Sequence, residues 1–280
     1  IQLIFIYLFL KKFFSPSFNL KLRITSKIKN FFSKFLPGIF SSGVTQINIL
    51  VGTIIASFQA SAVSYLYYAD RIYQINLAIA GIAIGTVILP NLSRYIKTND
   101  QKKINFIQNK SFQLCLFLSL PASMALIVGS EEITSALFGY GAFDNLSVLN
   151  SAEALYYFAI GLPAFAITKV FSTFLFAREN TKTPFYYSLI SVLINISISI
   201  LFFKQIGFII IPIATSIASW INAILLMYKL STNNYFKLRS IFSFSILKII
   251  SISIISISVF YMLINFVEEF LVYESEFKLF

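Results

Sequence analysis

Long apolar runs alternate with short polar segments along the whole chain. Most runs hold about 20 or more residues with few charges, which is the length that an α-helix needs to cross ~30 Å of hydrocarbon. Each run is too long to be a typical strand. The pattern predicts an all-α polytopic membrane protein with seven spans, at 36–58, 62–90, 111–129, 152–176, 184–203, 207–228 and 241–266.

Four other segments complete this organisation. Residues 1–10 are apolar but too short to cross a bilayer, so we interpret them as the end of a truncated helix in a fragment of a longer protein. Residues 11–35 form a basic loop, in which 21–32 is amphipathic and is expected along the inner membrane interface. Residues 131–149 are expected at the outer surface, and 267–280 form an acidic outer segment.

The sign of the charges alternates from one polar segment to the next. Basic residues dominate the segments 11–34, 91–110, 178–182 and 229–239. The intervening segments carry Glu131, Glu132 and Asp144, then Lys204, then Glu268, Glu269, Glu274 and Glu276. Because loops rich in Lys and Arg stay in the cytoplasm, the basic segments are predicted to be cytoplasmic.

Composition narrows the function classes. The chain is 58% hydrophobic and 12% charged, which excludes an ordinary soluble domain. Its net charge of +11 follows from the basic cytoplasmic segments and suits anionic lipid head groups, so we expect membrane lipids and no nucleic acid as partners. The absence of His removes the commonest metal ligand and general base, and Cys115 is the single cysteine. We expect no metal, no cofactor and no internal disulfide.

Asp70 and Arg71 are the most informative residues, because they stand side by side at the head of the apolar run 72–89. A charge at the centre of a membrane span costs ~2.5–3.5 kcal/mol on insertion scales, so such groups usually face a cavity. Helical spacing places a polar stripe on one face, made of Ser64, Tyr67, Arg71, Gln74 and Ala78. Adjacent residues point ~100° apart, so Asp70 and Arg71 need not pair. The alternative is that Arg71 reaches the outer interface with its long side chain.

Other polar residues lie inside the spans. Lys169 stands nine residues before Arg178, so it either faces the interior or stretches toward the inner head groups. Gln46 and Asn48 are expected to form hydrogen bonds between helices rather than substrate contacts.

Small residues and prolines predict local helix geometry. Gly81 and Gly85 form a small face that lets another helix approach closely. Pro90 is expected to end its span, and kinks or interruptions are expected at Pro121, Pro163, Pro212 and Gly207.

Four motifs resemble the MurJ (MviN) family of lipid II flippases, in matching order and spacing. They are LPGIFSSGVTQIN at 36–48, YLYYADR at 65–71 followed by GIAIGT at 81–86 and LPNLS at 89–93, LFGYGAF at 137–143, and FARENTKTP at 176–184. The resemblance implies the fourteen-helix fold of the multidrug/oligosaccharidyl-lipid/polysaccharide transporters, with two six-helix lobes around a central cavity. On that map, 36–230 is the second lobe and 241–266 is one additional helix.

The resemblance also implies a function. It predicts a monomeric, multi-pass flippase of the bacterial inner membrane that moves lipid II, a peptidoglycan precursor, by alternating access. Arg71 would bind the diphosphate, because a guanidinium stays charged and binds phosphate oxygens in pairs. Asp70 and Lys169 would tune the cavity charge or contact the sugar and peptide, and Tyr67 and Gln74 complete the expected binding set. The membrane potential or an ion gradient is the expected energy source for transport.

One residue departs from the family pattern. Some members carry an acidic residue of a cation site in the helix that corresponds to 36–58, where this chain has Gly52. A bound sodium ion is therefore not expected.

Three alternatives remain open from the sequence. A related polysaccharide-lipid flippase or a drug/cation antiporter would share the fold, and an antiporter would need carboxylates within the membrane, of which Asp70 is the plausible one. An enzyme acting on lipid phosphates would need clustered His, Asp or Glu. A scaffold for cell-wall enzymes would not depend on Arg71.

Overall fold

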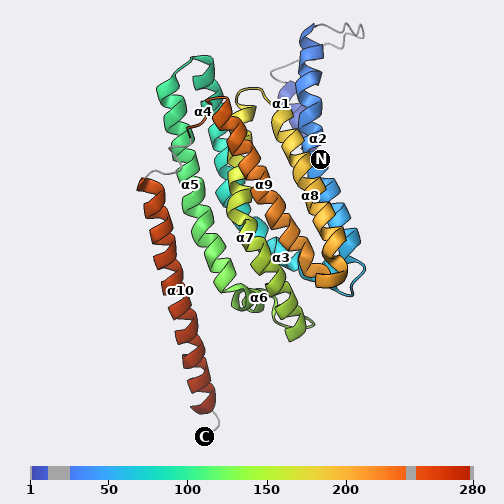
Figure 1. The fold of residues 1–280 in the computed structure, drawn as a ribbon, viewed down its shortest axis with the longest axis vertical. Helices are drawn as coiled ribbons and strands as arrows, with labels where there is room; N and C mark the ends of the chain where they lie inside the picture. The colour runs from blue at the N-terminus through green and yellow to red at the C-terminus, as the bar shows by residue number, and fades with distance from the viewer. Residues whose placement is uncertain (1, 12–25, 238–243, 278–280) are drawn as a thin grey trace.

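A computed structural model describes residues 2–11, 26–237 and 244–277, and these residues form helices and short connections without a strand (Figure 1). The helices are α1 (Gln2–Lys11), α2 (Ser26–Ala56), α3 (Ala62–Leu77), α4 (Ile84–Lys97), α5 (Gln101–Val128), α6 (Ser130–Phe138), α7 (Asn145–Phe176), α8 (Lys182–Ile206), α9 (Ile210–Thr232) and α10 (Phe244–Phe277). A π-helical segment, η1 (Ala78–Ala83), joins α3 to α4, and a 3-10 turn, η2 (Gly207–Ile209), joins α8 to α9.

Within the described residues, five stretches are long and apolar enough to cross a membrane. They are Ala62–Lys97, Gln101–Val128, Asn145–Phe176, Lys182–Thr232 and Phe244–Phe266. The stretch Lys182–Thr232 contains two antiparallel helices, because the chain reverses at Gly207, whose φ of +76° suits glycine (Figure 1). These findings confirm the predicted all-α membrane class.

Several helices extend beyond the predicted spans. The helix after Ala62 continues through Pro90 to Lys97, so the predicted end at Pro90 is wrong. Leu92, two residues after Pro90, is fully buried, so packing holds the helix together beyond the proline. Helix α5 begins at Gln101 rather than at 111, after Asp100, whose carboxylate accepts a hydrogen bond from the backbone N–H of Lys103 (3.2 Å).

The outer segment at 131–149 is divided between two helices. Helix α6 takes its first part, and α7 begins at Asn145, seven residues before the predicted start at 152. Asp144 caps α7 by accepting from the backbone N–H of Ser147 (2.9 Å). Hydrogen bonds from Ser147 also lower the pKa of the Asp144 carboxyl.

The two ends of the chain also differ from the prediction. Residues 26–32 of the amphipathic segment belong to the continuous helix α2 rather than to a separate interface helix, and 21–25 lie outside the described residues. Helix α10 continues to Phe277, so most of the segment 267–280 is helical. Hydropathy marks the part of a helix that suits lipid, whereas helix length also depends on capping and on charged turns outside the lipid.

The helix directions agree with the predicted alternation of charge. In Figure 1, the connections α4–α5 and α7–α8 and the end of α9 lie at one end of the bundle. The connections α2–α3, α5–α6–α7 and α8–α9 lie at the opposite end. The first end carries most of the basic residues, and the second carries Glu131, Glu132 and Asp144.

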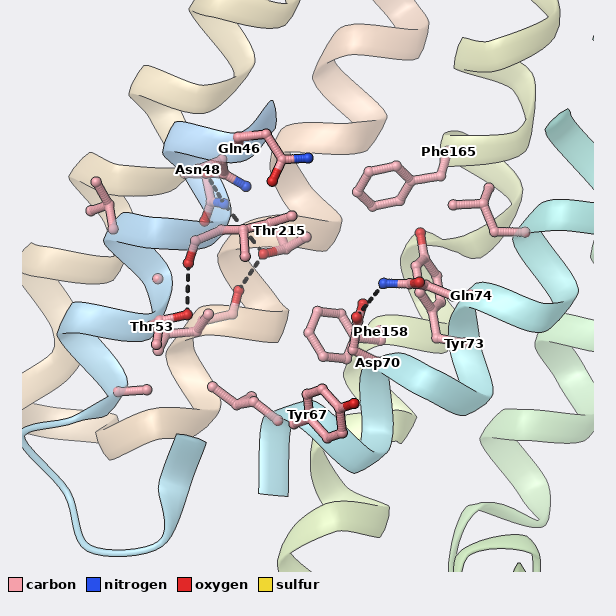
Figure 2. A pocket seen from close by; sticks show the side chains of 18 of the residues that line it. Gln46, Asn48, Thr53, Tyr67, Asp70, Tyr73, Gln74, Phe158, Phe165 and Thr215 are labelled. Carbon is pink, nitrogen blue, oxygen red and sulfur yellow. Dashed lines mark hydrogen bonds between the residues drawn. The ribbon is translucent and has the colours of Figure 1, made fainter. Parts of the chain in front are cut away.

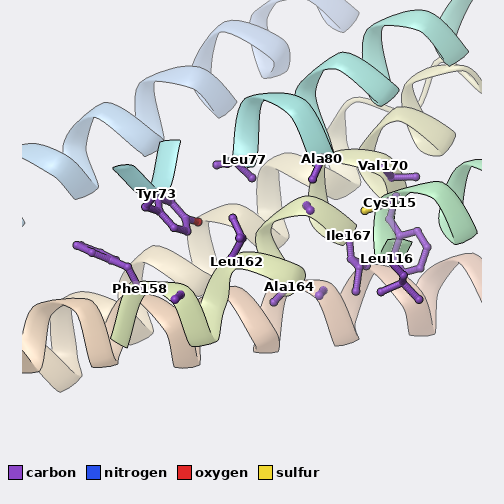
Figure 3. Close-up of a cluster of buried hydrophobic side chains, with 14 of the residues drawn as sticks. Tyr73, Leu77, Ala80, Cys115, Leu116, Phe158, Leu162, Ala164, Ile167 and Val170 are labelled. Atoms are coloured by element: carbon purple, nitrogen blue, oxygen red, sulfur yellow. The ribbon is translucent and has the colours of Figure 1, made fainter. Parts of the chain in front are cut away.

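Helix α7 is the centre of the bundle, because it packs against α3, η1, α4, α5, α6 and α9. Figure 3 shows its buried side chains meeting those of neighbouring helices, with Leu162 and Val170 on α7 and Cys115 on α5. Several contact positions hold alanine, including Ala154, Ala159, Ala164 and Ala166, each 0% exposed. Small residues let membrane helices approach closely, where packing rather than the hydrophobic effect drives association.

A hydrogen bond compensates for the proline in the middle of α7. Pro163 has no N–H, so the carbonyl of Ala159 loses its helical donor. The hydroxyl of Ser123 on α5 donates to this carbonyl instead (2.6 Å). Two side chains of α9 donate to nearby carbonyls of α7, Ser216 to Tyr157 (2.5 Å) and Trp220 to Ile160 (3.1 Å). Helices α5, α7 and α9 are thus joined at the proline.

Ser123→Ala is expected to lower the free energy of unfolding by about 1 kcal/mol, because it leaves the Ala159 carbonyl without a donor. Unfolding of the whole protein by SDS in mixed micelles measures this change in the free energy of unfolding. Ser258→Ala is the matched control, since that hydroxyl bonds to Ile254 of its own helix on an exposed face. In a Pro163→Ala background, which restores the N–H, the Ser123 effect should shrink. Equal effects of the Ser123 and Ser258 variants would contradict this account.

Candidate functional site

Five helices enclose a cavity of about 660 Å³ inside the bundle (Figure 2). Its walls come from α2, α3, α7, α8 and α9, with Ala78 and Ile82 added by η1. The structure brings all five predicted site residues to this cavity, namely Tyr67, Asp70, Arg71 and Gln74 from α3 and Lys169 from α7.

Helix α3 presents its polar stripe because its other face is buried. Ala69, Ile72 and Tyr73 are buried in the bundle, so the residues at helical spacing from Tyr67 turn toward the cavity. Arg71 lies nine residues after the first residue of α3, which is ~14 Å along the helix axis. The structure therefore places Arg71 in the cavity wall, away from the first turns of α3.

Asp70 and Arg71 have different partners. The carboxylate of Asp70 accepts a hydrogen bond from the amide of Gln74, which is also visible in Figure 2. The guanidinium carbon of Arg71 lies 4.5 Å from the centre of the Tyr67 ring. Because Lys169 adds a second cation and Asp70 is the one acidic residue among the described lining residues, the formal charge of the cavity is positive.

Gly81 and Gly85 bring the segment after α3 close to Lys169. A Cβ atom at Gly81 would lie 3.1 Å from Cα of Ala166 and 3.4 Å from Cβ of Lys169. A Cβ at Gly85 would lie 2.8 Å from Oγ1 of Thr173. The predicted close approach is confirmed, and α7 is the helix that approaches. The π-helical geometry of η1 was not predicted, and π-helical turns often occur at functional sites.

The opposite wall consists of uncharged polar residues that sequence analysis largely missed. Asn195 and Ser199 on α8 and Thr215 on α9 line the cavity together with Gln46 and Asn48 on α2. Asn195 Nδ2 donates to Asn48 Oδ1 (2.8 Å), which confirms the predicted interhelical bond of Asn48. The only signal for Asn195 and Thr215 in the sequence is that each is a polar residue in an apolar run.

Gly52 lies in this same wall, and a Cβ atom there would meet only Cγ2 of Ile211 within 4 Å, at 3.7 Å. Across the residues that the structure describes, no group of three or more His, Cys, Asp and Glu is arranged to hold a metal ion. The wall therefore offers amide and hydroxyl groups without a carboxylate.

The motif at 176–184 lies outside the cavity and organises one end of the bundle. Arg178 donates to the carbonyl of Phe174 (2.8 Å), and its guanidinium carbon lies 4.3 Å from the centre of the Tyr235 ring. Asn180 accepts from the backbone N–H of Thr183 (3.1 Å) at the start of α8. These contacts give the motif a structural role, because they tie the segment after α9 to α7.

Comparisons with known proteins agree with this architecture. The family model described as "Lipid II flippase MurJ" matches residues 1–280. A relative from Rhizobium meliloti (strain 1021), named "Probable lipid II flippase MurJ", is 42% identical over 204 residues, which are 73% of this chain and 38% of the relative.

Solved structures are also similar. "Lipid II flippase MurJ, inward closed conformation" has a TM-score of 0.71 and 31% identity, over 87% of this chain and 51% of that structure. A multidrug resistance MATE family transporter of the MOP superfamily, in an outward-facing conformation, shares the fold with a TM-score of 0.61 and 18% identity, over 79% of this chain and 50% of its own. The chain thus spans about half, or less, of the proteins it matches. With the family model matching throughout, and with fold and motifs in agreement, this chain belongs to the lipid II flippase MurJ family.

Proposed function

We propose that the whole protein translocates lipid II across the bacterial inner membrane by alternating access. The observation that carries this proposal is a positively charged cavity lined by helices of the bundle, with Arg71 in its wall. Family membership supports a transporter rather than an enzyme, and the name of the family supplies the lipid substrate.

Arg71 is the group we assign to the diphosphate. A guanidinium can form two parallel charge-assisted hydrogen bonds to phosphate oxygens, and these are stronger in a cavity than in bulk water. Gln74 holds the carboxylate of Asp70, and Tyr67 supports the Arg71 guanidinium, so the cation is oriented without direct capture by its acidic neighbour. Lys169 adds attraction from the α7 wall, while the lipid tail stays in the membrane.

We further propose that the basic end of the bundle faces the cytoplasm and that the protein acts as a monomer. The membrane potential is a suitable energy source for the return of the empty cavity. Moving one elementary charge through 100 mV is worth ~2.3 kcal/mol, which is enough to bias a conformational equilibrium about fiftyfold.

Genetic replacement tests the function. The gene for the whole protein should restore growth to a bacterium depleted of its own lipid II flippase, with membrane abundance verified by immunoblot. Purified protein in liposomes should also move labelled lipid II, but not a lipid-linked O-antigen unit, between leaflets. Failure of abundant wild-type protein in both assays would contradict the proposal, and movement of the O-antigen lipid alone would identify a different substrate.

A further inference from the structure

We propose that the wall opposite Arg71 is a subsite for the uncharged, N-acetylated saccharide of the lipid-linked substrate. We call it the amide wall, and it consists of Gln46, Asn48, Asn195, Ser199 and Thr215. The proposal rests on the proposed function, and it adds which part of the substrate each wall binds.

The amide wall and Arg71 lie at the same depth. Helix α2 ends at Ala56 and α3 begins at Ala62, so the two helices share one end of the bundle. Asn48 lies eight residues before the end of α2, or ~12 Å along the axis, and Arg71 lies ~14 Å from the start of α3. Figure 2 shows Gln46, Asn48 and Thr215 on one side of the pocket and Asp70, Gln74 and Tyr67 on another. One head group can therefore contact both walls.

The hydrogen bonds within the amide wall leave specific groups available. Asn195 is engaged by its neighbours, because Nδ2 donates to Asn48 (2.8 Å) and Thr215 (3.3 Å) and Oδ1 accepts from Ser199 (3.3 Å). Thr215 in turn donates to the carbonyl of Ile211 (2.7 Å). Among the described residues, Asn48 Nδ2 and the whole amide of Gln46 have no hydrogen-bond partner.

The available groups suit a neutral ligand. Polar groups at membrane depth are costly unless they bond to protein, water or a ligand. The amide groups offer donors and an acceptor without a charge, which matches the hydroxyl and acetamido groups of a sugar. The cations Arg71 and Lys169 lie on α3 and α7 and suit the diphosphate. The two walls would thus bind the head group in a single orientation, with the diphosphate at Arg71 and Lys169 and the saccharide toward α2.

Binding of three lipids to the purified whole protein in nanodiscs tests this assignment. The lipids are undecaprenyl diphosphate, the same lipid carrying one N-acetylglucosamine, and lipid II. Gln46→Leu keeps the size of the side chain and removes its hydrogen bonds. It should weaken binding of both saccharide lipids about three- to tenfold, the effect of a neutral hydrogen bond, and change undecaprenyl diphosphate binding less than twofold.

Two further variants accompany Gln46→Leu. Asn48→Ala should show the same selectivity, with its thermal unfolding measured because it also loses the bond to Asn195. Thr53→Val is the matched control, since Thr53 lines the same cavity but its hydroxyl is bound to Ile49 of its own helix (2.8 Å). It should alter none of the three affinities.

Each other outcome has a defined meaning. Equal weakening of all three lipids, or of none, by Gln46→Leu overturns the saccharide subsite while leaving lipid II transport intact. Weakening for lipid II alone overturns it in favour of a peptide contact. If the wild-type protein binds none of the lipids, the proposed function fails, and this assignment fails with it.

Discussion

Arg71→Gln is expected to weaken lipid II binding by about ten- to hundredfold and to abolish rescue of a flippase-depleted bacterium. The estimate follows from hydrogen bonds to charged groups, which contribute roughly 1.5–3 kcal/mol, or one to two factors of ten in affinity. Glutamine keeps a polar, though shorter, side chain and removes the cation that faces the cavity. Arg71→Lys should retain partial activity, because it keeps the charge and loses the paired geometry.

Arg94→Gln is the matched control for this prediction. Arg94 belongs to the same continuous helical stretch and also lies beside a tyrosine, with its guanidinium carbon 5.4 Å from the centre of the Tyr95 ring. It is exposed outside the cavity, so its loss removes an equal charge without touching the proposed site. Binding measured in nanodiscs and growth at equal membrane abundance should separate the two variants. Similar behaviour of both would assign Arg71 to general electrostatics rather than to phosphate binding.

Gly161→Ala is expected to destabilise the protein by about 1–2 kcal/mol. The added Cβ would lie 2.5 Å from Oγ and 2.9 Å from Cα of Ser216, so α7 and α9 must separate. Overpacking of this kind costs ~1–3 kcal/mol, and the gain of helix propensity, ~0.5–1 kcal/mol, offsets only part of it. The shift also strains the hydrogen bond from Ser216 to Tyr157. Unfolding by SDS in mixed micelles measures the change.

Gly52→Ala provides the comparison, because its Cβ would meet only Cγ2 of Ile211, at an ordinary 3.7 Å. This variant should be as stable as the wild type or up to ~1 kcal/mol more stable, through helix propensity alone. A Gly161 variant as stable as the Gly52 variant would show that the α7–α9 contact adjusts freely.

Much of the fold could be predicted from local pattern. The apolar runs identified the long apolar helices, and the alternating charge agrees with the alternating directions of these helices, because both signals come from how each segment meets lipid or water. Helix ends were harder to predict. The N-cap residues Asp100 and Asp144 place the starts of α5 and α7 well before the apolar runs begin. The helix that contains Pro90 continues beyond it, where Leu92 is buried. These features depend on single contacts that hydropathy does not describe.

The residues that line the cavity were predictable only on the side where a single helix, α3, provides most of them. Tyr67, Arg71 and Gln74 follow helical spacing, so their common face is visible in the sequence. Asn195 and Thr215 come from two other helices, and their meeting with Asn48 depends on how α2, α8 and α9 pack. A lone Asn in an apolar run does not indicate its neighbours. The amide wall is therefore a product of tertiary packing.

The hydrogen bonds that join α5, α7, α8 and α9 have an evolutionary consequence. Ser123, Ser191, Ser216 and Trp220 each donate from a side chain to a backbone carbonyl of another helix. A backbone carbonyl is present whatever residue occupies its position, so only one member of each pair is constrained in sequence. The residue that supplies the carbonyl can therefore be replaced by mutation without loss of the hydrogen bond. This arrangement allows lineages to diverge widely in sequence while they inherit the same helix packing.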